Sequence, residues 1–307
     1  MFSKLLNSPP SNLRGMAFMV ASVFFLVSMN ACVRVVTSDM GMHPFQAAFF
    51  RVSIGLVIFL PVLAYYKFEP LWTKHIGMHA LRGVLNAAAM LLYFFGIAVT
   101  PLAKVIAITF TAPLFATIMG VLILHEVIRA RRVTALIIGF IGGFIILRPG
   151  FIETEIGSIA IFASAALWGL TLVVIKALGR TDSSFTTTVY VSIFLTPLTL
   201  IVALPFWEWP GPDIWPWLLA MGILGTIGQV CLAQAFREAD MATILPIDFT
   251  KLIWAAALGF MLFGEVPDVW TWVGGALIFA STTYIAFREH REDSVRKSKE
   301  SKTSRLA

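Results

Sequence analysis

Long apolar runs divide almost the whole chain, and they constrain its fold more than any other feature of the sequence. A helix needs about 20 largely apolar residues to cross about 30 Å of hydrocarbon. Ten segments approach or exceed this length, at residues 13–36, 45–66, 76–98, 102–124, 133–148, 157–178, 185–206, 214–236, 242–263 and 269–288. The runs are continuous rather than alternating, which favours helices over a membrane barrel. We therefore predict an all-α integral membrane protein with ten transmembrane helices.

Composition agrees with a membrane protein and excludes several other classes. Hydrophobic residues make up 58% of the chain and charged residues 13%, whereas soluble domains are about 45–50% apolar and about 25% charged. The low charge content excludes intrinsic disorder, and two cysteines in 307 residues exclude a disulfide scaffold. The net charge of +6 is compatible with nucleic-acid binding. However, the basic residues lie in short loops and in the C-terminal tail, so we predict no nucleic-acid partner.

The distribution of charge predicts how the chain is oriented. If the N-terminus is cytoplasmic, most of the 23 Lys and Arg residues fall on the cytoplasmic side, as the positive-inside rule requires. Loops on the far side carry acidic residues instead. An even number of spans places both termini in the cytoplasm, so residues 1–12 and 289–307 are predicted to be cytoplasmic tails. The second tail is basic and suited to contact anionic membrane lipid. We expect a multi-pass protein of the cell inner membrane.

The two halves of the chain are similar in sequence at a fixed offset of 139 residues (248 − 109). The segment 109–126 aligns without a gap with the segment 248–265. The matches include Phe110 with Phe249, Thr111 with Thr250, Gly120 with Gly259 and Glu126 with Glu265. Five spans in each half is an odd number, so the repeats 13–148 and 157–288 enter the membrane in opposite orientations. Inverted repeats of this kind are typical of secondary transporters.

Several short motifs resemble the EamA branch of the drug/metabolite transporter superfamily. They are Phe50-Arg51, Thr111-Ala112-Pro113-Leu114, Gln234-Ala235-Phe236-Arg237, Pro246-Ile247-Asp248-Phe249-Thr250-Lys251 and Gly264-Glu265-Val266-Pro267-Asp268. The resemblance covers nearly the whole chain and implies two EamA domains around a central cavity. It implies that the third, fourth, eighth and ninth spans line most of that cavity. Family members export amino acids and metabolites, or import riboflavin or S-adenosylmethionine, and the second half looks closest to these importers.

The ninth span carries two charged residues that point to a substrate site. A charge at the centre of a bilayer costs about 2.5–3.5 kcal/mol even on insertion scales, so its presence suggests a function. Asp248 and Lys251 are three residues apart and share a helix face, which Trp254 continues one turn later. We interpret Lys251 as a partner for an anionic or carbonyl group and Asp248 as a partner for a donor or a coupling proton. Trp254 would stack on a ring. The alternative is a self-neutralising pair that positions the helix.

Other polar and aromatic residues within the spans fall into two groups. The first group is predicted to reach the cavity, although each member could instead join helices or face lipid; it comprises Asn86, Tyr93, Trp168, Gln229 and Gln234. The second group is predicted to have structural or gating roles. We expect Arg51 to snorkel to the interface or to support the structure, with contact to a ligand as the alternative. The prolines bend helices and the glutamates cap or tether helix ends. This group comprises Arg51, Pro113, Glu126, Pro246 and Glu265.

The sequence lacks the motifs of known catalytic chemistry. It contains no phosphate-binding glycine loop, no GxSxG and no three-ligand metal cluster, so we predict no enzymatic activity, cofactor or metal. Without an ATP site, transport must draw on an ion gradient, such as a proton gradient, or on exchange. We predict a secondary transporter that moves a small polar metabolite by alternating access, such as a riboflavin-like or S-adenosylmethionine-like compound. An exporter of amino acids, metabolites or drugs is the alternative carrier, and a passive small-solute channel is the alternative class. Monomer and homodimer remain open.

Overall fold

The computed structural model describes residues 12–65, 73–124, 130–147, 155–178, 184–238 and 247–284. In these ranges the chain is helical and has no β-strand, and helices occur in all ten predicted spans. They are α2 (Asn12–Arg34), α3 (Pro44–Tyr65), α4 (Ile76–Val99), α5 (Leu102–Thr109), α6 (Ala112–Leu124), α7 (Ala130–Leu147), α8 (Ile156–Leu178), α9 (Ser184–Ala203), α10 (Trp215–Glu238), α12 (Thr250–Phe263) and a last helix over residues 269–284. The predicted all-α fold is confirmed.

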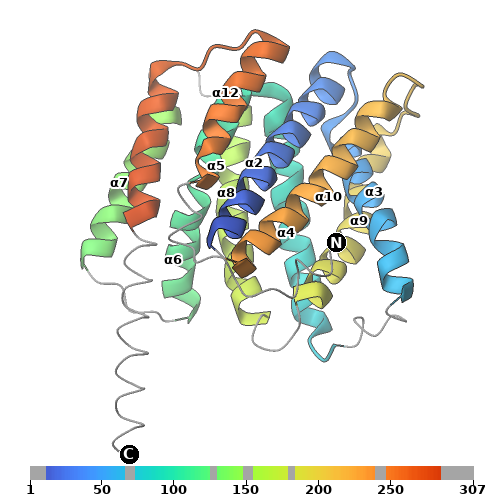
Figure 1. Ribbon diagram of the computed structural model, residues 1–307, viewed down its shortest axis with the longest axis horizontal. Helices are drawn as coiled ribbons and strands as arrows, with labels where there is room; N and C mark the ends of the chain where they lie inside the picture. Colours follow the sequence, from blue (N-terminus) through green and yellow to red (C-terminus); the bar gives the residue numbers. More distant parts are fainter. Residues whose placement is uncertain are drawn as a thin grey trace, which may run out of the picture.

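The lengths of the helices fit a membrane bundle. Within the described ranges, six helical stretches are long and apolar enough to span a bilayer, and three shorter apolar helices accompany them. One long stretch continues from α2 through a short π-helix (Val35–Asp39). The ninth prediction, α12, is shorter than expected because the regular helix begins only at Thr250. Figure 1 shows the helices side by side as one tilted bundle.

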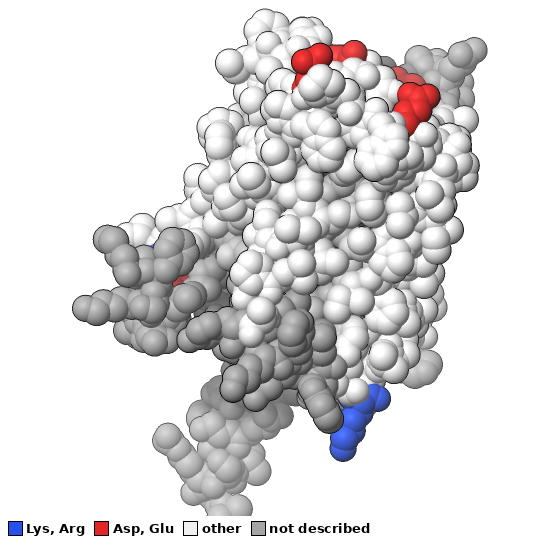
Figure 2. Space-filling view, turned by 90° about the vertical axis from the view of Figure 1, so that its right-hand side faces the viewer, with Lys and Arg blue, Asp and Glu red and all other residues white. Residues whose placement is uncertain are grey.

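Ion pairs identify which helix ends lie together. Arg14 at the start of α2 pairs with Glu238 at the end of α10, at 3.1 Å. Arg34, at the other end of α2, pairs with Glu265, which follows α12. Thus α2 runs antiparallel to α10 and in the same direction as α12. In the face shown in Figure 2, acidic side chains gather at the upper end and a basic side chain projects from the lower end. Acidic and basic side chains therefore lie at opposite ends of this face.

Two equivalent pairs of helices join the two halves of the chain. The most extensive helix contacts are α2 with α10 and α4 with α8. In the first pair, the Ser22 hydroxyl donates a hydrogen bond of 2.9 Å to the Gly228 carbonyl. In the second, the Ser164 hydroxyl donates one of 2.6 Å to the Ala89 carbonyl. The two acceptor residues, 89 and 228, are separated by the repeat offset of 139 (228 − 89). The two donor residues, 22 and 164, are separated by 142 (164 − 22), which is three more than the offset. The same contact is therefore made twice, as an inverted repeat requires.

The crossing of α7 with the last helix is symmetric in the same way. A Cβ atom on Gly274 would lie 2.5 Å from the Gly142 carbonyl oxygen, so the backbones approach more closely than any larger residue permits. At the other end of the crossing, the Ser281 hydroxyl donates a hydrogen bond to the Ala135 carbonyl. The repeat offset relates Ala135 to Gly274 and Gly142 to Ser281. The contact of Gly274 with Gly142 is therefore the repeat equivalent of the contact of Ala135 with Ser281. Small residues at these positions allow the two helices to cross so closely.

Candidate substrate-binding site

Two broken helices meet near the middle of the bundle. The fourth span is interrupted between α5 and α6, where Phe110 and Thr111 form a turn. The ninth span is interrupted at Phe249, between helical residues 247–248 and α12. Phe110 and Phe249 are equivalent in the two repeats, and their rings stack with centroids 4.2 Å apart and planes 27° apart. The two breaks therefore face each other across the axis that relates the repeats.

The same hydrogen bond occurs at both breaks. The Thr111 hydroxyl donates to the carbonyl of Ile108, and the Thr250 hydroxyl donates to the carbonyl of Ile247, each at 2.7 Å. A threonine that bonds to the backbone in this way competes with regular helical hydrogen bonding. Pro113, in the first turn of α6, has no N–H to continue the helix from α5. Broken helices at membrane depth occur where protein or a cavity surrounds them, and in transporters they mark the binding site.

The second break carries the charged pair. Asp248 immediately precedes the turn, Lys251 lies in the first turn of α12, and the two side chains form an ion pair. Their side chains are 22% and 19% exposed, so neither is fully sealed from a neighbouring solute. The structure thus brings together the two residues on which the sequence interpretation depended. Trp254 follows on the same helix, where its ring meets Phe24 of α2 edge-on at 5.5 Å.

The first break carries an uncharged network with one nearby cation. The Asn30 amide of α2 donates a hydrogen bond of 2.9 Å to the hydroxyl of Tyr93 in α4. Thr109, the last residue of α5 before the break, lies beside the same hydroxyl. Arg51 of α3 interacts electrostatically with Tyr93. Four helices therefore contribute polar atoms to one region, which we call the Tyr93 cluster (Asn30, Arg51, Tyr93 and Thr109).

The remaining predicted cavity residues lie elsewhere. Asn86 is buried on the same side of α4 as Tyr93. Gln234 is buried against Glu238, to which it donates a hydrogen bond of 2.9 Å at the inner end of α10. Gln229 is exposed on α10, and Trp168 of α8 is 37% exposed. Within the described residues, no hydrogen bond or ion pair joins any of these four side chains to the Asp248–Lys251 pair.

Glu265 binds three parts of the molecule together at the end of the bundle where α2 and α12 both end. Its carboxylate pairs with Arg34 and accepts a hydrogen bond of 2.8 Å from the backbone N–H of Leu102. Arg34 also donates to the carbonyls of Ile97 and Thr100. Gly264, with φ at 65°, turns the chain out of α12 so that Glu265 can reach these groups. These contacts agree with the predicted tether. The other two predicted structural residues, Glu126 and Pro246, lie outside the described residues.

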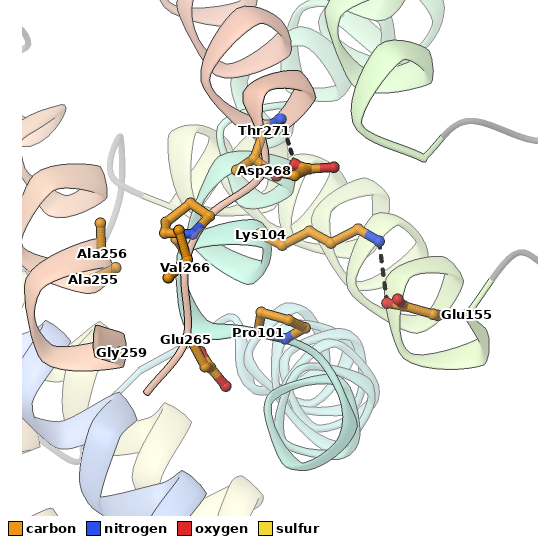
Figure 3. Close-up of a pocket in the computed structure, with 12 residues that line it drawn as sticks. Pro101, Lys104, Glu155, Ala255, Ala256, Gly259, Glu265, Val266, Asp268 and Thr271 are labelled. Atoms are coloured by element: carbon orange, nitrogen blue, oxygen red, sulfur yellow. Dashed lines mark hydrogen bonds and ion pairs between the residues drawn. The ribbon is translucent and has the colours of Figure 1, made fainter. Parts of the chain in front are cut away.

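A pocket of about 180 Å³ lies beside this tether. It is formed between α5, the start of α8 and the segment that follows α12 (Figure 3). Its charged side chains already have partners: Lys104 pairs with Glu155 at 3.1 Å, and Asp268 accepts a hydrogen bond of 2.8 Å from the backbone N–H of Thr271. This chemistry is that of a closed helix end. We therefore take the two helix breaks, and not this pocket, as the candidate site.

The sequence did not single out some residues of the Tyr93 cluster and of the contacts around Glu265. Asn30 is as polar as Asn86 and lies in an equally apolar run, so it could have been selected on the same grounds. Arg34 carries no local signal of its own in the sequence, yet it is the partner of Glu265. Thr109 aligns with Asp248 at the repeat offset but is uncharged, so charge does not single it out. Their partners are far away in sequence, 63 residues in the case of Asn30 and Tyr93, and no local pattern reports such a contact.

The architecture and the comparisons with known proteins agree on the class. A helical membrane bundle with two matched broken helices is typical of a membrane transporter. The model of the EamA-like transporter family matches residues 13–148 and 155–287. The chain belongs to the EamA-like transporter family, within which the sequence resemblance had placed it.

Three relatives illustrate how far the similarity extends. A riboflavin transporter of Vibrio cholerae is 31% identical over 276 residues, which cover 89% of this chain and 93% of that protein. An S-adenosylmethionine uptake transporter of Rickettsia prowazekii is 27% identical over 250 residues, 81% of this chain and 85% of that protein. A crystal structure of another protein aligns with a TM-score of 0.58 at 18% identity, covering 88% of this chain and 99% of that one. This last similarity supports the fold alone.

Proposed function

We propose that this protein is a secondary transporter of the inner membrane that takes up a small polar metabolite of the riboflavin or S-adenosylmethionine type. The observation that carries the proposal is the Asp248–Lys251 pair at a broken helix. Similarity to a riboflavin transporter across 89% of the chain supports the substrate class. Phe110 and Phe249 offer aromatic surface at the breaks, and Tyr93 lies beside Thr109 at the first break, which suits a compound with a heterocyclic ring.

The pair suggests how binding is coupled to movement. In the empty carrier, Asp248 and Lys251 neutralise each other, which keeps the cost of holding charge inside the membrane low. A carbonyl or anionic group on the substrate competes for Lys251 and releases Asp248 to accept a donor or a proton. The carrier thereby exchanges an internal ion pair for substrate contacts. The two breaks then open together to the opposite side, as alternating access between inverted repeats requires.

Counterflow in proteoliposomes tests this proposal. Vesicles preloaded with excess unlabelled compound receive trace labelled riboflavin, S-adenosylmethionine or an amino-acid mixture, one at a time. We expect transient accumulation of one label, because a carrier exchanges inner for outer substrate. Lys251→Ala should abolish that accumulation while the protein still inserts and purifies. Lys104→Ala is the matched control, since it removes a lysine from the outer end and should leave accumulation largely intact.

The other outcomes separate the alternatives. Equilibration of label without accumulation, at a rate that does not saturate, identifies a passive channel. Unchanged saturable transport in Lys251→Ala removes Lys251 from the site. Accumulation of no label rejects uptake of these compounds, and export of amino acids or toxic metabolites from intact cells then becomes the measurement that decides.

A further inference from the structure

Arg51 holds a positive charge well inside the membrane. It lies seven residues after Pro44, the first residue of α3, which at 1.5 Å per residue places it about 10 Å below the outer end of that helix. Its side chain is directed into the bundle. The Nε atom lies 3.3 Å from the position that a Cβ on Gly225 of α10 would occupy, and the guanidinium interacts with Tyr93 of α4. Sequence alone favoured snorkelling toward the interface, but these neighbours belong to the interior.

The charge of Arg51 has no acidic partner in the described part of the chain. Other basic residues of the bundle do have one: Arg34 pairs with Glu265, Lys104 with Glu155 and Lys251 with Asp248. Among the described residues, Tyr93 is the electrostatic neighbour of Arg51, and a neutral phenol does not balance a guanidinium. Because a buried charge without a counter-ion is costly, the position is suited to an anion that arrives from outside the protein.

The surroundings of Arg51 also have unused hydrogen-bonding capacity. Asn30 is 4% exposed, and its amide nitrogen is engaged by Tyr93 while its carbonyl oxygen is buried without a hydrogen-bond partner. The Thr109 hydroxyl at the first helix break is already engaged, since it donates a hydrogen bond of 2.8 Å to the Val105 carbonyl. At the second break the charges of Asp248 and Lys251 cancel. The described groups around the two breaks therefore carry one net positive charge, and it lies on Arg51.

We propose that Arg51 binds an anionic group of the substrate, a carboxylate or a phosphate, beside Tyr93 and Asn30. The guanidinium presents paired N–H donors that match two oxygens of such a group, and the Asn30 carbonyl accepts from a donor next to it. The rest of the substrate extends over the stacked Phe110 and Phe249 toward Lys251. This inference rests on the proposed function and adds to it that the transported compound is negatively charged at one end.

Matched ligand pairs test the inference by binding rather than by transport. One pair is riboflavin 5′-phosphate and riboflavin, and the other is S-adenosylmethionine and its decarboxylated form. Within each pair only the anionic group differs. Affinity is measured as the ligand-induced shift in thermal unfolding of the purified full chain. We expect the wild type to bind the member that carries the carboxylate or phosphate, in one of the pairs, at least tenfold more tightly than the member that lacks it. Arg51→Gln should remove that preference, so that both members bind about equally.

Further variants distinguish a specific loss of binding from a failure to fold. Arg51→Lys keeps the charge but not the fork of donors, so we expect a partial loss. Tyr93→Phe removes the hydroxyl beside the guanidinium and should weaken binding of the anionic member by less than Arg51→Gln does. Arg14→Gln, the same substitution at the inner end, should bind as the wild type does. Size-exclusion profiles and unliganded melting temperatures identify any variant that fails to fold.

Binding and counterflow together distinguish this inference from the proposed function. Saturable counterflow that Arg51→Gln leaves unchanged, with equal affinity for both members of a pair, keeps the transporter and overturns the anion site. Binding of an anionic member that depends on Arg51, without counterflow, keeps the anion site and overturns transport. Failure of the wild type to prefer, or to bind, either anionic member also overturns the proposal.

Discussion

At the scale of single residues, Glu265 shows how one carboxylate can hold a membrane bundle closed at one end. It engages a cation from α2 and a backbone donor from the start of α5. Neither partner belongs to its own half of the chain. The side chains of Arg34 and Glu265 are only 14% and 15% exposed. Solvent therefore screens this pair weakly, and breaking it leaves a charge with little compensation.

Glu265→Gln should lower the stability of the protein by about 1–3 kcal/mol, because Arg34 loses its counter-ion while the amide oxygen can still accept from Leu102. Thermal unfolding of the purified protein in one detergent measures the effect. Glu155→Gln is the control: its carboxylate is 45% exposed, so the loss should stay below about 1 kcal/mol. Equal losses in the two variants would show that burial does not set the strength of these pairs.

At the scale of helices, the sequence predicted where the spans lie but not how they are interrupted. Periodicity and length identify ten apolar runs, since any helix that crosses a bilayer must satisfy the same length requirement. The matched Phe-Thr dipeptides indicated duplication. Their stacking could not be predicted, because it depends on two segments separated by 139 residues meeting at the repeat axis. The Tyr93 cluster was hidden for the same reason: its members come from four helices.

The crossing of α7 with the last helix makes a prediction at this scale. Gly274→Ala places a methyl group against the backbone of Gly142, which cannot rotate away as a side chain could. The helices must separate, so we expect a loss of about 1–3 kcal/mol in thermal or denaturant unfolding. Gly77→Ala, in the first turn of α4, meets nothing within 4 Å and should be neutral or stabilising by up to about 1 kcal/mol. Indistinguishable unfolding of the two variants would contradict the close crossing.

At the scale of the whole molecule, the distribution of charge predicts the orientation in the membrane. The positive-inside rule predicts that the start of α4 faces the cytoplasm and that the loop before α10 faces outward. On the face shown in Figure 2, acidic side chains lie at one end and a basic side chain at the other. Chemical labelling from each side of the membrane measures the orientation directly.

Single cysteines test the orientation. Gly77 and Gly211 both have open space around the position of a Cβ, so Gly77→Cys and Gly211→Cys are suited to labelling. The background replaces the two native thiols, Cys32→Ala and Cys231→Ala. In intact cells a membrane-impermeant maleimide should label Gly211→Cys, and it should label Gly77→Cys only after permeabilisation. The reverse labelling pattern would show that the protein has the opposite orientation in the membrane.

The pairing of α2 with α10 and of α4 with α8 has a consequence for how such a chain could arise. Each of these tightest contacts joins a helix of the first half to a helix of the second, so neither half contains a complete packing unit. A single five-helix ancestor could bury its helix faces only against a second copy inserted upside down. The duplication would then have joined two chains that already depended on each other, and selection could afterwards place Asp248 and Lys251 in one copy and Arg51 in the other.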